Sequence, residues 1–212
     1  MDMTGTDHES KTKLLDAALN VIRAKGYTAT RIEDVCAAAG LTKGSFFHHF
    51  KSKEDLALAA TAHWGALADG LFVSAAYRAL PDPRDRLLGY VDFRKALLQG
   101  ELPRFTCLVG TMVQEVYETH PLIREACDKS ISDHAAGLEA DIAEAMSQYG
   151  LDDATWSAQS LALHTQAVIQ GAFVLAKAKH SAGVAAASID HLRRYLELLF
   201  TRAKAATARR LQ

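Results

Sequence analysis

Apolar residues recur along almost the whole chain at steps of three and four, which is the spacing of one face of an α-helix. No β-branched run of alternating polarity is long enough for a useful strand. Gly and Pro stand between the periodic stretches, as at Gly26, Gly40, Pro83 and Pro121. These residue types stop or start helices, so the sequence predicts an all-α fold of about nine helices.

Start and stop signals set the bounds of the predicted helices. Ser10 is expected to cap the first, and a capping box over residues 30–33 is expected to open the second. Pro83 suits a first helical position, and Asp152 or Asp153 is expected to cap a later helix. The predicted helices cover residues 10–25, 30–40, a short stretch after 42, a stretch from 52 that includes 71, 83–99, 107–119, 121–149, 154–179 and 187–204, with a loop at 101–106 and a connection at 181–186.

The segment 38–42, Ala-Ala-Gly-Leu-Thr, joins two short helices in the manner of a helix-turn-helix. Gly40 can adopt the positive φ that reverses the chain, and Thr42 can cap the second short helix. In that helix Phe46 and Phe50 lie four residues apart and are expected to face the core. The other side would then present residues to the major groove of DNA: Lys43, Ser45, Phe47, His48 and His49.

Charge is unevenly distributed, although the whole chain has a formal net charge of -1. Residues 10–53 carry eight basic and three acidic side chains, a net charge of +5. Residues from 57 onward carry 16 basic and 17 acidic ones. A compact basic head attracts phosphates, while a solvated surface face would explain the charge alone equally well.

Two further features exclude broad classes of protein. Cys36, Cys107 and Cys127 are scattered and odd in number, which favours a reducing compartment over a disulfide framework. The first ten residues are polar, unlike a signal peptide, and no apolar run approaches the roughly 18 residues of a membrane span. We therefore expect a cytoplasmic protein without membrane contact.

The turn, the short helix after it and the Ser-Lys-Glu opening of the next helix follow one another at a characteristic spacing. The residues concerned are Gly26-Tyr27, Thr30, Ile32, Val35, 38–45, His49-Phe50 and 52–56. They closely resemble the N-terminal signature of TetR-type transcriptional regulators. The resemblance implies a DNA-binding domain at residues 1–56 and a ligand-binding and dimerisation domain at 57–212. It also implies a homodimeric repressor that binds a palindromic double-stranded operator and is released by a small apolar or amphipathic effector.

The resemblance also implies which side chains contact DNA. TetR-type regulators usually have Tyr at the position of Phe47, so a hydroxyl contact to phosphate is missing here, while the ring can still pack on a sugar or a thymine methyl. His48 and His49 could instead be surface residues without a role. By place on the duplex, the expected contacts are Thr30 and Arg31 on one phosphate strand, Thr42, Lys43, Ser45 and His48 near the base edges, Gly44 at a close approach, and Phe47, His49 and Lys53 on the opposite flank.

The segment 105–121 resembles the pocket-facing helix of many family members, because it mixes soft apolar residues with isolated polar ones. Each aromatic or thioether residue there could equally be ordinary core. Cys107 and Cys127 could form a redox sensor or be plain buried thiols. The expected effector-binding residues are Trp64, Phe93, Cys107, Met112 and Tyr117.

The last two helices carry more apolar surface than one intramolecular face requires, which suits a four-helix dimer interface. Plain burial within the monomer is the alternative. The expected interface residues are Trp156, Ala167, Gly171, Leu192, Tyr195, Leu196 and Leu199.

No enzyme motif occurs in the sequence. Glu-x-x-His pairs, His-Glu-x-x-His, Gly-x-x-x-x-Gly-Lys and Gly-x-Ser-x-Gly are all absent, so we expect no catalysis, metal or cofactor. A helical protein-interaction module or a ligand-binding protein without a DNA role is the alternative function. Neither would explain the basic head or the spacing of its turn.

Overall fold

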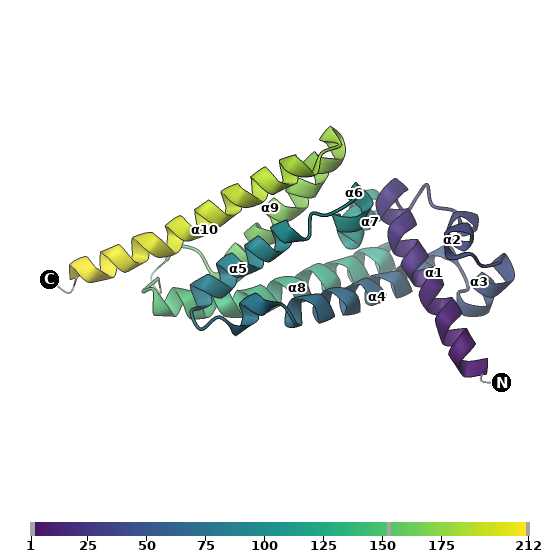
Figure 1. Ribbon diagram of the computed structural model, residues 1–212, viewed down its shortest axis with the longest axis horizontal. Helices are drawn as coiled ribbons and strands as arrows, with labels where there is room; N and C mark the ends of the chain where they lie inside the picture. The colour runs from purple at the N-terminus through teal and green to yellow at the C-terminus, as the bar shows by residue number, and fades with distance from the viewer. Residues whose placement is uncertain (1–2, 152–153, 211–212) are drawn as a thin grey trace. The chain divides into compact units, whose positions relative to one another are not determined.

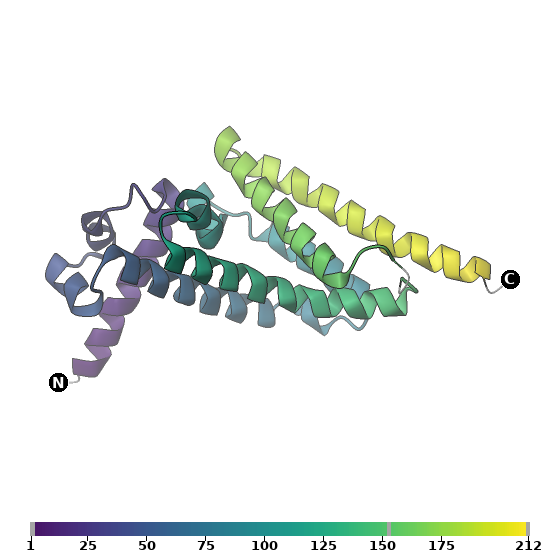
Figure 2. The same cartoon turned by 180° about the vertical axis from the view of Figure 1, so that it is seen from behind.

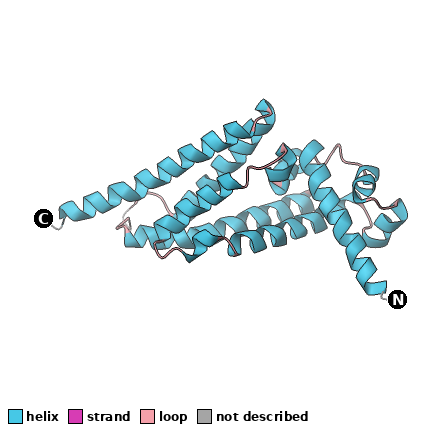
Figure 3. Cartoon of the chain, in the orientation of Figure 1, coloured by secondary structure: helices cyan, strands magenta, loops and turns pink. Residues whose placement is uncertain are grey.

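The computed structural model describes residues 3–151 and 154–210, and these residues form helices joined by turns (Figures 1 and 3). The described part contains ten α-helices, one 3-10 helix and no strand, which confirms the all-α prediction. The elements are α1 (Met3–Lys25), α2 (Ile32–Ala39), α3 (Lys43–His49), α4 (Lys53–Val73), η1 (Ala76–Ala79), α5 (Pro83–Ala96), α6 (Leu102–Phe105), α7 (Leu108–Val116), α8 (Pro121–Gln148), α9 (Ala158–Lys179) and α10 (Ala182–Arg210).

Several helix ends differ from the sequence prediction. α1 begins at Met3 rather than Ser10. α10 begins at Ala182, within the predicted connection 181–186, because the alanines there favour a helix. α2 starts after Arg31, whose N–H donates to Asp34 Oδ2 at 2.8 Å, so the capping box lies one residue later than predicted. The short elements η1 and α6 were not predicted.

α9 also has a different cap from the one expected. Ser157 Oγ accepts from the N–H of Ser160 at 3.1 Å, and Ser160 Oγ accepts from the N–H of Ser157 at 3.0 Å. These reciprocal bonds satisfy two free donors at the start of the helix, which therefore begins at Ala158. The caps predicted at 152–153 lie outside the described residues.

The chain divides into two compact units. Unit 1 comprises residues up to Gly70 together with Thr106–Ile131, and unit 2 comprises Leu71–Phe105 together with the residues from Ser132 onward. This division is based on compactness, whereas the boundary predicted between residues 56 and 57 separates two functions. That functional boundary stays a prediction.

Unit 1 has one apolar core to which the first four helices, α7 and the start of α8 all contribute. Burying a large apolar side chain contributes roughly 1.5–3 kcal/mol, so the core fixes α2 and α3 against α1. Its most fully buried side chains include Leu14, Ile22, Phe46, Leu56, Leu108, Met112 and Ile123.

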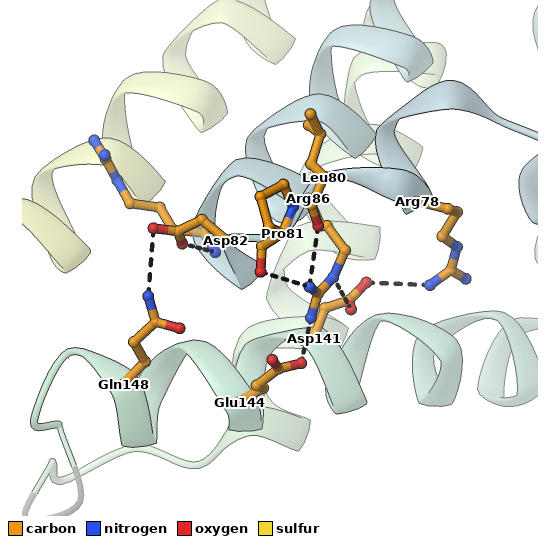
Figure 4. A network of polar contacts seen from close by, with 9 residues as sticks. Arg78, Leu80, Pro81, Asp82, Arg86, Asp141, Glu144 and Gln148 are labelled. Atoms are coloured by element: carbon orange, nitrogen blue, oxygen red, sulfur yellow. Dashed lines mark hydrogen bonds and ion pairs between the residues drawn. The ribbon is translucent and has the colours of Figure 1, made fainter.

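In unit 2, α10 packs along both α9 and α5, and Figures 1 and 2 show α9 and α10 side by side. Ion pairs join α5 and η1 to α8 (Figure 4). Asp141 accepts from Arg86 Nε at 2.8 Å and from Arg78 Nη1 at 3.1 Å, while Glu144 pairs with Arg86. Asp141 is buried, and the two guanidinium groups offset its lost hydration.

One helix of the described part, α4, is long and apolar enough to span a membrane by length and composition. No such segment was expected from the sequence. The core helix of a soluble protein passes the same test. In α4 the residues Leu56, Ala57, Ala60 and Thr61 are buried in unit 1, whereas Leu67, Leu71 and Val73 are exposed.

Candidate nucleic-acid interface

The turn between α2 and α3 has the geometry that its sequence predicts. Gly40 adopts φ 66°, in the left-handed region where a side chain is disfavoured. The N–H of Leu41 donates to Cys36 O at 2.9 Å, and Thr42 Oγ1 accepts from the N–H of Ser45 at 3.2 Å. The reversal and the cap together place the start of α3 at the surface.

α3 has an inner and an outer side. Phe46 and Phe50 are buried with ring centroids 5.6 Å apart, which confirms that they face the core. On the outer side Phe47 is 57% exposed. The other expected DNA contacts on this helix and its cap are Thr42, Lys43, Gly44 and His48, which are exposed, and Ser45 and His49, which are half-buried.

The space around Gly44 would accommodate a larger side chain without moving any neighbouring residue. A Cβ there would meet only Thr42 Oγ1, at an ordinary contact distance of 3.5 Å. Nothing within the chain therefore requires glycine at this exposed position. Its small size matters only to something that approaches from outside, as DNA would.

Lys43 and Lys25, two of the basic residues of the head, are each paired with a carboxylate on α2. Lys43 Nζ lies 2.5 Å from Glu33 Oε1, and Lys25 Nζ lies 2.5 Å from Asp34 Oδ2. All four side chains are substantially exposed, so solvent screens both pairs and each contributes little to stability. Lys43 can therefore exchange its carboxylate for a phosphate at small cost.

The expected contacts at the start of α2 differ from one another. Thr30 is buried, and its hydroxyl donates to Gly26 O at 2.6 Å. This bond stabilises the α1–α2 turn and leaves no side-chain surface for phosphate, so the predicted contact does not fit the burial of Thr30. Arg31 is exposed and fits its predicted contact.

His49 and Lys53 also contact other parts of unit 1. His49 Nε2 lies 2.6 Å from Ser10 Oγ. Lys53 Nζ donates to the carbonyls of Tyr27, Thr28 and Thr30, at 3.1, 3.4 and 3.1 Å. Burial lowers the pKa of Lys53, and the charge of Glu115 partly opposes that shift. Lys53 would have to exchange carbonyls for a phosphate in order to contact DNA.

The expected effector-binding residues are not all in one unit. Trp64, Cys107, Met112 and Tyr117 belong to unit 1, where Arg23 Cζ lies 5.0 Å from the ring centroid of Trp64. Met112 is fully buried and Tyr117 is exposed. Phe93 belongs to unit 2, in an aromatic cluster with Phe72 and Tyr77 at centroid distances of 5.5 and 5.8 Å. A single pocket lined by all five stays a prediction.

Cys107 and Cys127, the two candidates for a redox sensor, have different environments within unit 1. Cys107 caps α7, with Sγ accepting from the N–H of Gly110 at 3.4 Å. Burial raises the pKa of Cys127 to about 12, which keeps that thiol protonated. Within the described residues, no group of three or more His, Cys, Asp or Glu side chains could hold a metal ion.

A buried polar chain in unit 2 was not anticipated from the sequence. Gln166 Nε2 donates to Tyr90 Oη at 2.8 Å, and Tyr90 Oη lies 3.0 Å from His134 Nε2. Burial and the positive charges of Arg94 and Arg78 lower the pKa of His134 to about 4. His134 is therefore neutral at pH 7. The partners lie 44 and 76 residues apart in sequence, so no local pattern signals them.

The expected dimer residues lie on different sides of α9 and α10. Leu192 and Leu196 are buried within the monomer, because α10 turns this side toward α9 and α5, and they are not available to a partner. Trp156 and Leu199 are half-buried, whereas Ala167, Gly171 and Tyr195 are exposed. The exposed large apolar residues of the two helices are Leu163, Val174, Leu175, Tyr195 and Leu198.

Comparison with known proteins agrees with this architecture. The family described as "Bacterial regulatory proteins, tetR family" matches residues 14–60, and the family "Transcriptional regulator LmrA/YxaF-like, C-terminal domain" matches residues 83–187. The crystal structure of a TetR transcriptional regulator from Chloroflexus aurantiacus has a TM-score of 0.76 and 26% identity, covering 92% of this chain and 97% of that one.

Curated relatives match over shorter lengths. The regulator CymR of Pseudomonas putida is 50% identical over 56 residues, 26% of this chain and 27% of CymR. The repressor NemR of Escherichia coli K12 is 26% identical over 145 residues, 66% of this chain and 69% of NemR. In three curated relatives, CymR among them, the matched segment spans only 20% to 27% of the relative's length. With both ends of its fold matched by regulator families, the chain belongs to the TetR family of bacterial regulatory proteins.

Proposed function

We propose that the protein is a cytoplasmic, homodimeric transcriptional repressor that binds a palindromic operator and leaves it when a small apolar or amphipathic effector binds. The observation that carries the proposal is the outer side of α3. It presents Lys43 and His48 together with the exposed ring of Phe47, on a helix whose inner side is locked into the core by Phe46 and Phe50. Exposed aromatic and basic side chains on a rigid, two-turn helix suit the major groove.

Phosphates would position this head and side chains would read the bases. The N–H groups at the start of α3, capped by Thr42, and the side chains of Arg31 and Lys43 suit phosphate contacts. Ser45 and His48 suit base edges, and Gly44 allows the backbone to come close. Thr30 supports this surface from beneath, through its bond to Gly26 O.

Dimerisation would use the exposed side of α9 and α10. Ala167 and Gly171 are small and exposed, so a second helix can approach α9 closely. The exposed apolar side chains Leu163, Tyr195 and Leu198 flank them on the two helices. Two copies of this face would form a four-helix interface with apolar contacts at its centre.

Mobility-shift titration with the DNA upstream of the protein's own gene tests the proposal, with a shuffled duplex of equal length and composition as the control. We expect tight binding to the upstream DNA at a salt concentration that suppresses binding to the shuffled duplex. Equal, weak binding to both would support a helical interaction module or a ligand-binding protein instead. Repeating the titration with candidate effectors then tests release.

A further inference from the structure

The turn between α1 and α2 is held by a residue from a distant part of the sequence. Glu115, near the end of α7, accepts from the N–H of Tyr27 at 3.2 Å through Oε1 and from the N–H of Thr28 at 2.9 Å through Oε2. One carboxylate thus bonds two successive backbone donors that follow the end of α1. Hydrogen bonds to a charged acceptor are stronger than neutral ones, so this contact fixes both the position and the orientation of the turn.

Gly26 makes room for this contact. It has φ 86°, and a Cβ built on it would lie 2.1 Å from Glu115 Oε1. Any other residue at 26 would strain the backbone, and its Cβ would displace the Glu115 carboxylate from this position. Gly26 and Glu115 are therefore matched to each other across 89 positions of sequence.

Lys53 holds the carbonyl side of the same turn. Its Nζ donates to the carbonyls of Tyr27, Thr28 and Thr30, and lies 4.3 Å from the ring centroid of Tyr27. The buried Tyr27 ring also meets His120 edge-on at 5.3 Å. An anion on the N–H side and a cation on the carbonyl side thus hold the turn that leads into Arg31 and α2.

We infer that Glu115 is a positioning residue for operator binding, acting through the α1–α2 turn on the placement of Arg31 and of α2 and α3. The inference rests on the proposed function, since it assigns a role in DNA binding to a residue outside the helix-turn-helix. Cys107 caps α7 and Met112 lies within it, and both are expected effector-binding residues. A displacement of α7 that lengthens both Glu115 bonds beyond hydrogen-bond range would release the α1–α2 turn. An effect of effector binding at α7 would then reach α2 and α3 through the α1–α2 turn rather than along α4.

The decisive variant is Glu115→Gln, which keeps the size of the side chain but can accept only one of the two N–H bonds. Glu118→Gln is the matched control, because Glu118 is an exposed acid three residues further along. Three quantities are measured for each protein: the melting temperature, the exchange rates of the Tyr27 and Thr28 amide hydrogens, and the affinity for operator DNA by fluorescence anisotropy. Affinity is measured well below the melting temperature, so that a loss of folded protein does not enter.

For Glu115→Gln we expect faster exchange at Tyr27 and Thr28 and an operator affinity lower by about three- to tenfold, the size expected for one weakened charge-assisted bond. Glu118→Gln should leave exchange and affinity unchanged. A melting temperature that falls while operator affinity stays at the wild-type value would overturn the inference and make the contact merely structural. Unchanged exchange at both amides would show that the contact does not form in solution.

The same data separate this inference from the proposed function. If the wild-type protein binds no operator DNA, the proposed function fails and the inference falls with it. If the wild type binds and Glu115→Gln binds equally well, only the inference fails. Glu115→Asp gives a further check, since the shortened carboxylate should lose both bonds and weaken binding at least as much as Glu115→Gln.

Discussion

The ring of Phe47 stands edge-on to the ring of Phe46, with centroids 5.2 Å apart and planes at 84°. The two neighbours have opposite environments, since Phe46 is fully buried and Phe47 is 57% exposed. Phe46 anchors α3, and its contact with Phe47 helps to orient the exposed ring. The arrangement separates the stability of the helix from its contact surface, which makes the two positions independently testable.

Phe47→Tyr should strengthen operator binding by roughly two- to tenfold, because the new hydroxyl can donate to a phosphate. Its stability should stay within about 0.5 kcal/mol of wild type, since the added group enters solvent. Phe46→Tyr is the control, and burying the same hydroxyl there should cost about 1–3 kcal/mol of stability. Anisotropy titration and urea unfolding measure the two effects. Unaltered affinity in Phe47→Tyr would place position 47 away from the phosphates.

Substitutions of Lys43 and Glu33, which form an ion pair, should change DNA affinity in opposite directions. Lys43→Ala should weaken binding to all DNA sequences and lower the slope of log affinity against log salt by about 0.9, the contribution of one phosphate contact. Glu33→Gln should strengthen binding, because Lys43 no longer has to leave a carboxylate. Titrations at several salt concentrations give both slopes. A Lys43→Ala variant with the wild-type slope would exclude a phosphate contact at Lys43.

Gly44→Ala should separate folding from DNA binding. Ala favours a helix over Gly by roughly 1 kcal/mol, and the added Cβ meets no atom closer than 3.5 Å, so the melting temperature should stay level or rise. Operator affinity should fall, because the methyl group occupies the space that the duplex needs. A stable variant with full affinity would show that α3 does not approach DNA at this residue.

The helix-turn-helix could be predicted from sequence because its determinants are local. Gly40, Thr42 and the Phe46–Phe50 spacing lie within about three turns of helix, and each acts through neighbouring backbone or a shared helix face. The contact between Glu115 and the α1–α2 turn could not be predicted in this way. It joins residues 87 and 88 positions apart, and only the packing of α7 in unit 1 brings them together.

The same reasoning explains why two of the residues predicted for the dimer interface, Leu192 and Leu196, are buried within the monomer. Leu196 and Leu198 are both apolar residues of one helix, and their spacing cannot show which of them another helix of the same chain covers. α5 and α9 cover Leu196, and Leu198 stays 56% exposed. Apolar surplus thus indicated helices that carry exposed apolar side chains, while the choice of side needed the tertiary contacts.

His134 gives unit 2 a pH-dependent stability. Its pKa is about 4 in the folded protein against an ordinary value of 6.5, so the unfolded chain takes up the proton first as the pH falls. The stability contributed by neutral His134 is present above pH 6.5 and is lost between pH 6.5 and 4, by an amount on the order of a few kcal/mol. Urea unfolding of wild type and His134→Gln across this range measures it. The variant keeps a hydrogen-bond acceptor for Tyr90 but cannot titrate, so its stability should fall less; equal slopes would locate the pH dependence elsewhere.

Leu198→Asp and Leu196→Asp should have different consequences, although the residues are two positions apart. Leu198 is exposed in the monomer, so Leu198→Asp should leave a folded chain that light scattering shows as a monomer. Burying the new carboxylate in a dimer interface without a partner would cost several kcal/mol. Operator affinity should then collapse, because a single head contacts only one half-site. Leu196→Asp places the charge inside unit 2 and should lower the melting temperature instead. A Leu198→Asp variant that remained a dimer of wild-type stability would move the interface away from this side of α10.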